Sequence, residues 1–211
     1  MFIRTDSIRW NVVSSLLTVA FVLTLASTEQ SSAQEKPKSK PKDAQAAINA
    51  EVKSLLRAKN WIVVGGRLEE LGAQGYDAYT ELLDDPKASE RSISRIYYLL
   101  SEQRGDRSQF KKYAVRDLSR PEDLLRSNVI AFLGTVGGRE DAKLLVPLLA
   151  DEQGLVQSEA AKALSRIGDA RQLQTLELRM EIVAKSGDPD TYKAMKIARD
   201  AWKIRLEKEM K

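Results

Sequence analysis

Few side chains in this sequence are suited to catalytic chemistry. Its 211 residues include no His and no Cys, the residues that most often titrate near neutral pH, bind zinc or act as thiol nucleophiles. Zinc hydrolysis through His ligands, Ser-His-Asp and Cys-His triads, haem held by His and thiol redox chemistry are therefore excluded. The carboxylates show no spacing that singles out an acid–base pair, and no glycine-rich phosphate loop occurs. We expect a protein that is not an enzyme and that needs no cofactor or metal.

Polar side chains that recur at helical spacing are better candidates for binding. They form three columns when successive segments of the chain are overlaid with shifts of 33 and 31 residues. These candidate binding residues are Arg95, Asn128 and Glu159 in the first column, Tyr98 and Lys162 around Ala131 in the second, and Glu102, Thr135 and Arg166 in the third. The columns mix charge sign and polarity, which suits a peptide or folded protein. The alternative is a solvated face with no partner.

Such columns require a repeating helical scaffold, and helix breakers recur at the right period. One series, with spacings of 33, 33 and 30 residues, consists of Gly72, Gly105, Gly138 and Gly168. A second series, offset from the first, consists of Pro86, Pro121, Gly154 and Pro189. Two interleaved series of about this period are typical of stacked helix pairs.

The apolar residues between the breaks repeat as well. The segment SNVIAFLGTVGG from Ser127 overlays SEAAKALSRIGD from Ser158 with a shift of 31 residues. The overlay places Leu133 on Leu164, within an i, i+3, i+4 pattern that marks one face of a helix. A shift of 33 in the other direction lays Leu100 onto Leu133. Three consecutive units are therefore expected to share one buried stripe.

These patterns predict an all-α fold, an α-α superhelix (solenoid) of about five antiparallel helix pairs. The pairs are 44–58 with 60–72, 75–84 with 86–103, 107–118 with 121–136, 139–150 with 154–167, and 170–185 with 189–209. Within the first pair, the β-branched and glycine-rich segment 60–66 allows a strand or a kinked helix instead. The last helix is expected to cap the solenoid, which needs a closed end.

Helix starts are predicted from capping residues. Asp85-Pro86 and Asp188-Pro189 each supply an N-cap oxygen followed by a proline at the first helical position. The segment 119–122, Ser-Arg-Pro-Glu, has the spacing of a capping box.

Two lines of the sequence, LLADEQGLVQSEAAKALSRIGD and DLSRPEDLLRSNVIAFLGTVGG, carry a family resemblance. Each has a leucine-rich first helix, an Asp near the turn, and a second helix that ends in Leu-x-x-Ile/Val-Gly. Residues 75–170 resemble HEAT repeats, specifically those of the phycobilisome-lyase type, and Pro147 matches a bend common in the family's first helices. The departures are Val156-Gln157 and Leu125-Arg126, where the family usually has Val-Arg.

The resemblance implies that the second helix of each pair lines a concave face, on which the three columns would lie. It implies a non-catalytic scaffold that binds another protein through this face. The alternative implied by the resemblance is a bilin lyase-like protein that handles a chromophore. The formal net charge of +4 is not gathered into a basic stripe, so we expect no nucleic-acid partner.

The amino terminus has the order of a secretory signal peptide. Arg4 and Arg9 precede an uncharged, mostly apolar run from Asn11 to Ala26, and small residues follow. We expect a signal peptide over 1–33 with cleavage after Ala33, a Lys/Pro-rich linker over 34–43, and the solenoid over 44–211. The protein would then be exported, as a periplasmic or secreted protein. If the segment stays uncleaved, it anchors the protein, and only then is membrane contact expected.

Overall fold

The computed structural model describes residues 41–211, where helices are the only regular secondary structure. The expected signal peptide and residues 34–40 of the expected linker lie outside the described residues. The α-helices are α1 (Pro41–Arg57), α2 (Trp61–Leu71), α3 (Tyr76–Asp84), α4 (Glu90–Glu102), α5 (Lys111–Asp117), α6 (Asp123–Val136), α7 (Arg139–Leu145), α8 (Gly154–Ile167), α9 (Ala170–Ser186) and α10 (Pro189–Glu209). Three short 3₁₀ helices are η1 (Gly72–Gly75), η2 (Ser108–Phe110) and η3 (Pro147–Ala150). The predicted all-α solenoid is confirmed.

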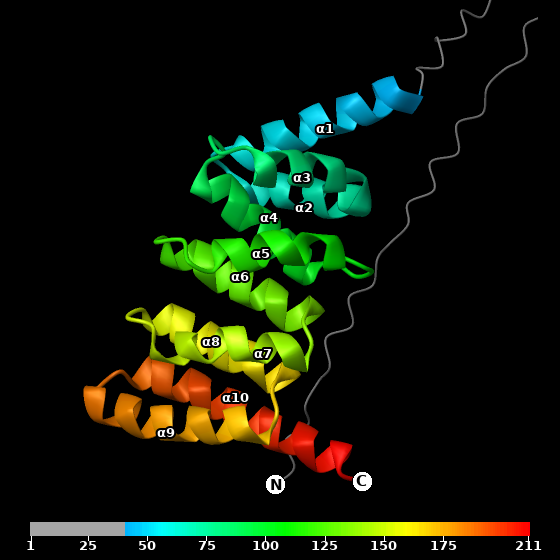
Figure 1. Ribbon diagram of the computed structural model, residues 1–211. Helices are drawn as coiled ribbons and strands as arrows, with labels where there is room; N and C mark the ends of the chain where they lie inside the picture. The colour runs from blue at the N-terminus through cyan, green and yellow to red at the C-terminus, as the bar shows by residue number, and fades with distance from the viewer. Residues whose placement is uncertain (1–40) are drawn as a thin grey trace, which may run out of the picture. The chain divides into compact units, whose positions relative to one another are not determined.

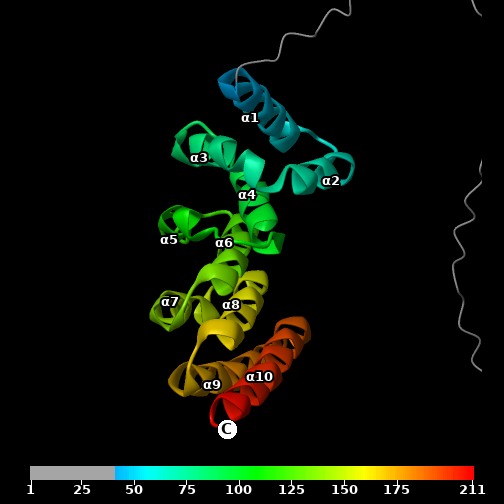
Figure 2. The same ribbon diagram turned by 90° about the vertical axis from the view of Figure 1, so that its right-hand side faces the viewer.

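Successive helix pairs stack on one another (Figure 1). In Figure 2, α3, α5, α7 and α9 form one column and α4, α6, α8 and α10 form a second column beside it. The helices of this second column, which we call the inner helices, pack directly on one another from α4 to α10. The first pair differs, because α1 packs against both α3 and α4. The inner helices carry the columns of candidate binding residues.

Leu133 and Leu164 occupy equivalent places in successive inner helices. Both are fully buried, and each carbonyl accepts a hydrogen bond from the glycine that ends its helix, at 2.8 Å from Gly137 and 2.7 Å from Gly168. The next helix then begins with a similar cap in both units, because the Gly138 amide donates to Asp141 Oδ2 at 2.9 Å and the Asp169 amide donates to Gln172 Oε1 at 2.7 Å. The predicted 31-residue overlay is therefore confirmed in packing and in helix ends.

Close contact between inner helices depends on glycine at two positions. A Cβ atom added to Gly134 on α6 would lie 2.7 Å from the Cβ of Ala163 on α8. A Cβ added to Gly168 would lie 2.3 Å from a ring carbon of Trp202 on α10. Both distances are well below van der Waals contact, so the stacking distance here requires the absence of a side chain.

Two of the three predicted helix starts are wrong. Asp85-Pro86 does not begin a helix, because the Asp85 carboxylate accepts a hydrogen bond from the Lys87 amide in a turn and α4 begins later, with Ser89 as its N-cap. Asp followed by Pro suits a turn as well as a helix start. Residues 119–122 form no capping box, since Glu122 is itself the N-cap of α6. Asp188-Pro189 is confirmed: the Asp188 carboxylate accepts a hydrogen bond from the Thr191 amide.

Three further predictions concern the first helix pair and the end of α7. Segment 60–66 forms part of helix α2 from Trp61 and is not a strand. Helix α1 begins at Pro41, so residues 41–43 of the expected linker are helical; a proline at the first position and Asp43 in the first turn both favour that start. Pro147 follows the end of α7 and begins η3, which is the predicted bend.

Candidate functional site

Seven of the eight candidate binding residues line one hollow of about 690 Å³ on the inner helices. We call it the central hollow. The seven are Tyr98 and Glu102 from α4, Asn128 and Thr135 from α6, and Glu159, Lys162 and Arg166 from α8. The structure thus brings together candidate residues, found by the overlay of repeats, that are up to 68 positions apart in the sequence.

Helix α6 contributes the smallest side chains to the lining of the central hollow. Ala131 is half-buried and Gly134 is buried, and both line the hollow. At the column position of Ala131, the neighbouring helices carry the long side chains of Tyr98 and Lys162. The result is a groove along α6 with an aromatic wall on one side and a charged wall on the other.

Local partners already hold several polar groups of the central hollow. Lys162 Nζ lies 2.9 Å from Glu159 Oε2, in an exposed ion pair of small energetic value. Asn128 Nδ2 donates to Ser94 Oγ at 2.9 Å. Within residues 41–211, no ion pair engages Glu102 or Arg166, which leaves these two charges, one on each wall, available to a partner.

A second hollow of about 740 Å³ adjoins the first and shares Tyr98 and Asn128 with it. We call it the aromatic hollow. Its apolar lining consists of Trp61, Tyr98 and Leu124, with Tyr98 40% and Leu124 51% exposed. The rings of Trp61 and Tyr98 meet edge to face, with centroids 6.0 Å apart. Charged residues, Glu90, Arg91 and Glu122 among them, line the rest.

The aromatic hollow was not foreseen. Trp61 lies on α2, which is outside the segment that repeats clearly. Leu124 did carry a signal, because shifts of 33 and 31 residues align it with Arg91 and Leu155 as a fourth column. Leu155 is likewise exposed, at 48%.

Arg95, the eighth candidate, lines the aromatic hollow rather than the central one. Its Nη1 donates to the carbonyl oxygens of Leu56 at 2.8 Å and Ala58 at 2.7 Å. Its guanidinium also lies over the Trp61 ring, 4.8 Å from the centroid. Arg95 therefore fixes the end of α1 and the orientation of Trp61, and its hydrogen-bonding atoms point toward the backbone.

Arginines elsewhere act on helix ends in the same way. Arg107 donates to the carbonyl of Leu100 at 2.6 Å, Arg116 to that of Leu83 at 3.0 Å, and Arg205 to that of Ser165 at 2.9 Å. Carbonyls in the last turn of a helix have no partner within the helix and carry partial negative charge. The basic residues of this chain thus serve its internal packing as well as its surface.

Asp117 is a fully buried carboxylate between α4 and α5. It accepts hydrogen bonds from the Tyr97 hydroxyl at 2.8 Å and from Arg116 Nε at 2.9 Å. Burial raises the pKa of the Asp117 carboxyl, but the hydrogen bonds from Arg116 and Tyr97 outweigh it, so the pKa lies below its ordinary value. Burial and the adjacent Asp117 raise the pKa of Tyr97. The hydrogen bonds from Tyr97 and Arg116 therefore keep Asp117 charged in the packed interface between α4 and α5.

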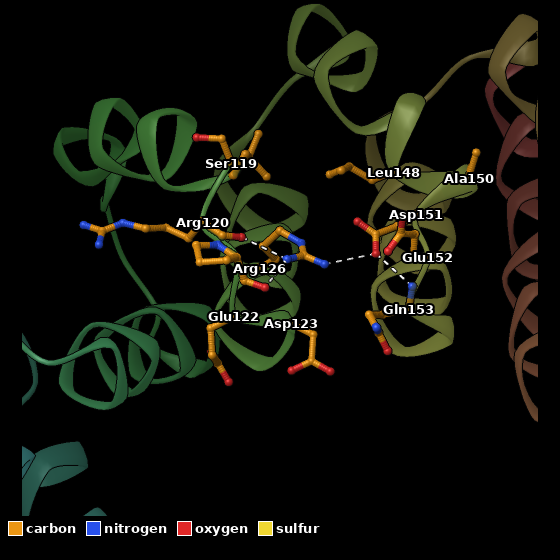
Figure 3. A pocket seen from close by; sticks show the side chains of 12 residues that line it. Ser119, Arg120, Glu122, Asp123, Arg126, Leu148, Ala150, Asp151, Glu152 and Gln153 are labelled. Carbon is orange, nitrogen blue, oxygen red and sulfur yellow. Dashed lines mark hydrogen bonds and ion pairs between the residues drawn. The ribbon is translucent and has the colours of Figure 1, made fainter.

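A third hollow, of about 580 Å³, lies at the turns that precede α6 and α8 (Figure 3). Arg126 Nη2 lies 3.0 Å from Asp151 Oδ1, and both side chains are largely buried. Arg126 Nη1 also donates to the carbonyl oxygens of Arg120 and Pro121. One arginine therefore ties the turn of its own unit to the turn of the next, which keeps the inner helices in register.

Residues 41–211 contain neither a cluster of metal-binding side chains nor a helix that could span a membrane. No group of three or more acidic side chains in this range is arranged to hold a metal ion. No helix of this same range is long and apolar enough to cross a bilayer.

No curated protein matches the chain. Residues 114–182 match the family described as HEAT repeats. The matched segment extends from α5 into α9 and includes α6 and α8, which carry five of the seven candidates in the central hollow. The helix pairs within this matched segment are therefore similar to HEAT repeats.

Proposed function

We propose that this protein is a non-catalytic scaffold that binds another protein through its inner helices, outside the cytoplasm. The observation that carries the proposal is the pair of adjoining hollows that share Tyr98 and Asn128. One hollow is mainly apolar and the other is polar and charged, which is the composition of a protein-binding surface with an apolar centre and polar rim. HEAT repeats, which match residues 114–182, suggest the same role.

Tyr98 is the expected anchor of the interface. Its side chain is 40% exposed and lines both hollows, so a bound segment would contact it from either side. Tyrosine supplies a large apolar surface with little conformational entropy to lose, and it is over-represented among the residues that dominate binding energy. We expect Tyr98→Ala to weaken partner binding by about 2 kcal/mol or more.

The test begins with affinity capture from an envelope extract and identification of the captured protein by mass spectrometry. Binding is then measured with Tyr98→Ala and with the double reversal Glu159→Lys, Lys162→Glu, which keeps an ion pair but exchanges its charges. The matched control exchanges Glu177 and Lys203, an exposed pair between α9 and α10 whose atoms lie 2.6 Å apart. Binding that survives both inner-helix variants unchanged would overturn the proposal.

Export is the second part of the proposal, and the order of residues in 1–33 supports it. We expect the mature protein in the periplasmic or secreted fraction, with its first residue at Gln34. Mass spectrometry of the protein's amino-terminal peptide measures this. Full-length protein in the membrane fraction would favour the anchored alternative, and full-length protein in the cytoplasm would refute export.

The phycobilisome-lyase type of HEAT repeat implies a different role, the handling of a bilin. We propose protein binding instead, because those lyases work beside cytoplasmic antennae. Purified protein mixed with bilin is expected to leave the bilin's absorbance spectrum unchanged, and a shifted spectrum would favour the lyase-like role.

A further inference from the structure

Helix α10 continues the series of inner helices, with a shift of 35 residues from α8. Both helices begin at equivalent positions, Gly154 and Pro189. The buried residues of α8, Val156, Ala160, Ala163 and Ile167, align with the buried residues of α10, Thr191, Met195, Ala198 and Trp202. The candidate positions Glu159, Lys162 and Arg166 then align with Ala194, Ile197 and Ala201. The three columns therefore continue onto α10, where they turn apolar.

The apolar positions of α10 form a stripe that extends to Ile204. Ile197 is 62% and Ile204 is 54% exposed, so no part of residues 41–211 covers them. We call this stripe the α10 seam; its members are Ala194, Ile197, Ala201 and Ile204. Their spacing of 3, 4 and 3 residues is that of a coiled-coil seam, over about 15 Å of helix. An exposed seam of this kind fits a second helix.

The seam does not extend the stack of repeats. On α8, Gln157, Ala161 and Leu164 are also buried. Their equivalents on α10 are Tyr192, Lys196 and Arg199, which are polar and at least partly exposed. The stack therefore ends at α10, and a helix on the seam would have to approach from the side that carries the columns.

We propose that the α10 seam pairs with the α10 seam of a second copy of this chain, antiparallel, about a twofold axis near residue 199. In that register Ala194 faces Ile204 of the second copy, and Ile197 faces Ala201 of the second copy. Every layer then places one large side chain against one small one. This alternation of size is what interdigitated helix packing needs, and it lets the two helices approach closely.

The charges beside the seam fit the same register. Lys193 and Glu207 lie on one flank, one near each end of the seam, and neither forms an ion pair within the described part of the chain. An antiparallel pair brings each Lys193 near Glu207 of the second copy, whereas in a parallel pair each Lys193 would face the opposite flank of the other helix and would not meet Glu207. Asp200, close to the axis, is already paired with Arg199 at 2.6 Å.

The first test is the molar mass of the purified protein, measured by sedimentation equilibrium. We expect twice the mass of one chain. Ile197→Asp is expected to weaken association by at least about a hundredfold, because it places a charge in the centre of the seam. Ile182→Asp on α9 is the matched control, since Ile182 is similarly exposed, at 54% against 62% for Ile197, but lies off the seam. Circular dichroism verifies that both variants are folded.

The register has its own tests. Lys193→Glu is expected to weaken association about tenfold, and the exchange Lys193→Glu with Glu207→Lys is expected to restore it. Because the chain contains no Cys, Asp200→Cys introduces a single thiol near the axis. This variant should form a disulfide-linked dimer on oxidation, while Leu178→Cys should not.

A monomeric protein at tens of micromolar would overturn the proposal, even if its seam bound a helix of some other protein. So would a dimer that Ile197→Asp leaves intact. The proposal does not depend on the proposed function: loss of the dimer in Ile197→Asp, with partner binding still sensitive to Tyr98→Ala, would separate the two.

Discussion

The substitution Gly134→Ala tests the contact between α6 and α8 most directly. The added Cβ would lie 2.7 Å from the Cβ and 2.8 Å from the Cα of Ala163, about 1 Å closer than two carbon atoms normally approach. Since one of these atoms belongs to the backbone of α8, a side-chain rotation does not relieve the clash. The two helices have to move apart.

The magnitude follows from two opposing effects. Overpacking of a close contact costs about 1–3 kcal/mol, and the rigid neighbour places this case at the upper end. Alanine favours a helix over glycine by about 1 kcal/mol. We therefore expect Gly134→Ala to lower the free energy of unfolding by about 1–2 kcal/mol.

Gly66→Ala is the matched control, because it makes the same chemical change within helix α2. Nothing lies within 4 Å of a Cβ added there, so only the helix preference remains. We expect this variant to gain about 0.5–1 kcal/mol. Urea unfolding followed by circular dichroism measures both. If Gly134→Ala stabilises the protein as Gly66→Ala does, the close approach of α6 and α8 is refuted.

Three further variants test separate contacts. Gly168→Ala is expected to destabilise by about 1–3 kcal/mol in urea unfolding, because the added methyl group meets the buried Trp202 ring; unchanged stability would contradict this contact. Tyr97→Phe removes the hydroxyl that donates to Asp117 and should cost about 1–3 kcal/mol, since the carboxylate is charged and buried. The pKa of Asp117 is lower in the folded protein than its ordinary value, so its stabilising effect is complete above the unfolded pKa and is lost as the pH falls through the folded value. Urea midpoints from pH 7 to pH 2 should therefore fall less steeply below pH 4 for Asp117→Asn than for the wild type, and parallel curves would refute a depressed pKa.

The repeat pattern allowed the central part of the fold to be predicted closely. Helices α8 and α10 begin and end where the breakers and caps placed them, and seven candidate residues share one hollow. This succeeded because each unit buries its apolar stripe against its neighbours, so the same positions must be apolar in every unit. Exposed columns then follow from the buried ones by helical geometry.

Contacts made by one residue alone could not be predicted in this way. Arg95 lies in a column by its spacing, but its guanidinium reaches the end of α1, 37 to 39 residues away in the sequence. Pro86 satisfies the rule for a helix start and the rule for a turn equally well, and the turn formed. In both cases the outcome depends on a neighbour in space that the repeat period does not specify.

The side chains of the exposed columns differ in chemical character from one inner helix to the next, whereas those of the buried stripe do not. Tyr98, Ala131, Lys162 and Ile197 occupy one column on α4, α6, α8 and α10, and they are aromatic, small, basic and aliphatic in turn. Packing against the next unit restricts the buried positions, whereas a change on the exposed column leaves that packing intact. The inner helices can therefore present different chemistry at each step without loss of the stack. A partner that bound along them would have to match this order, which gives the column specificity that no single position provides.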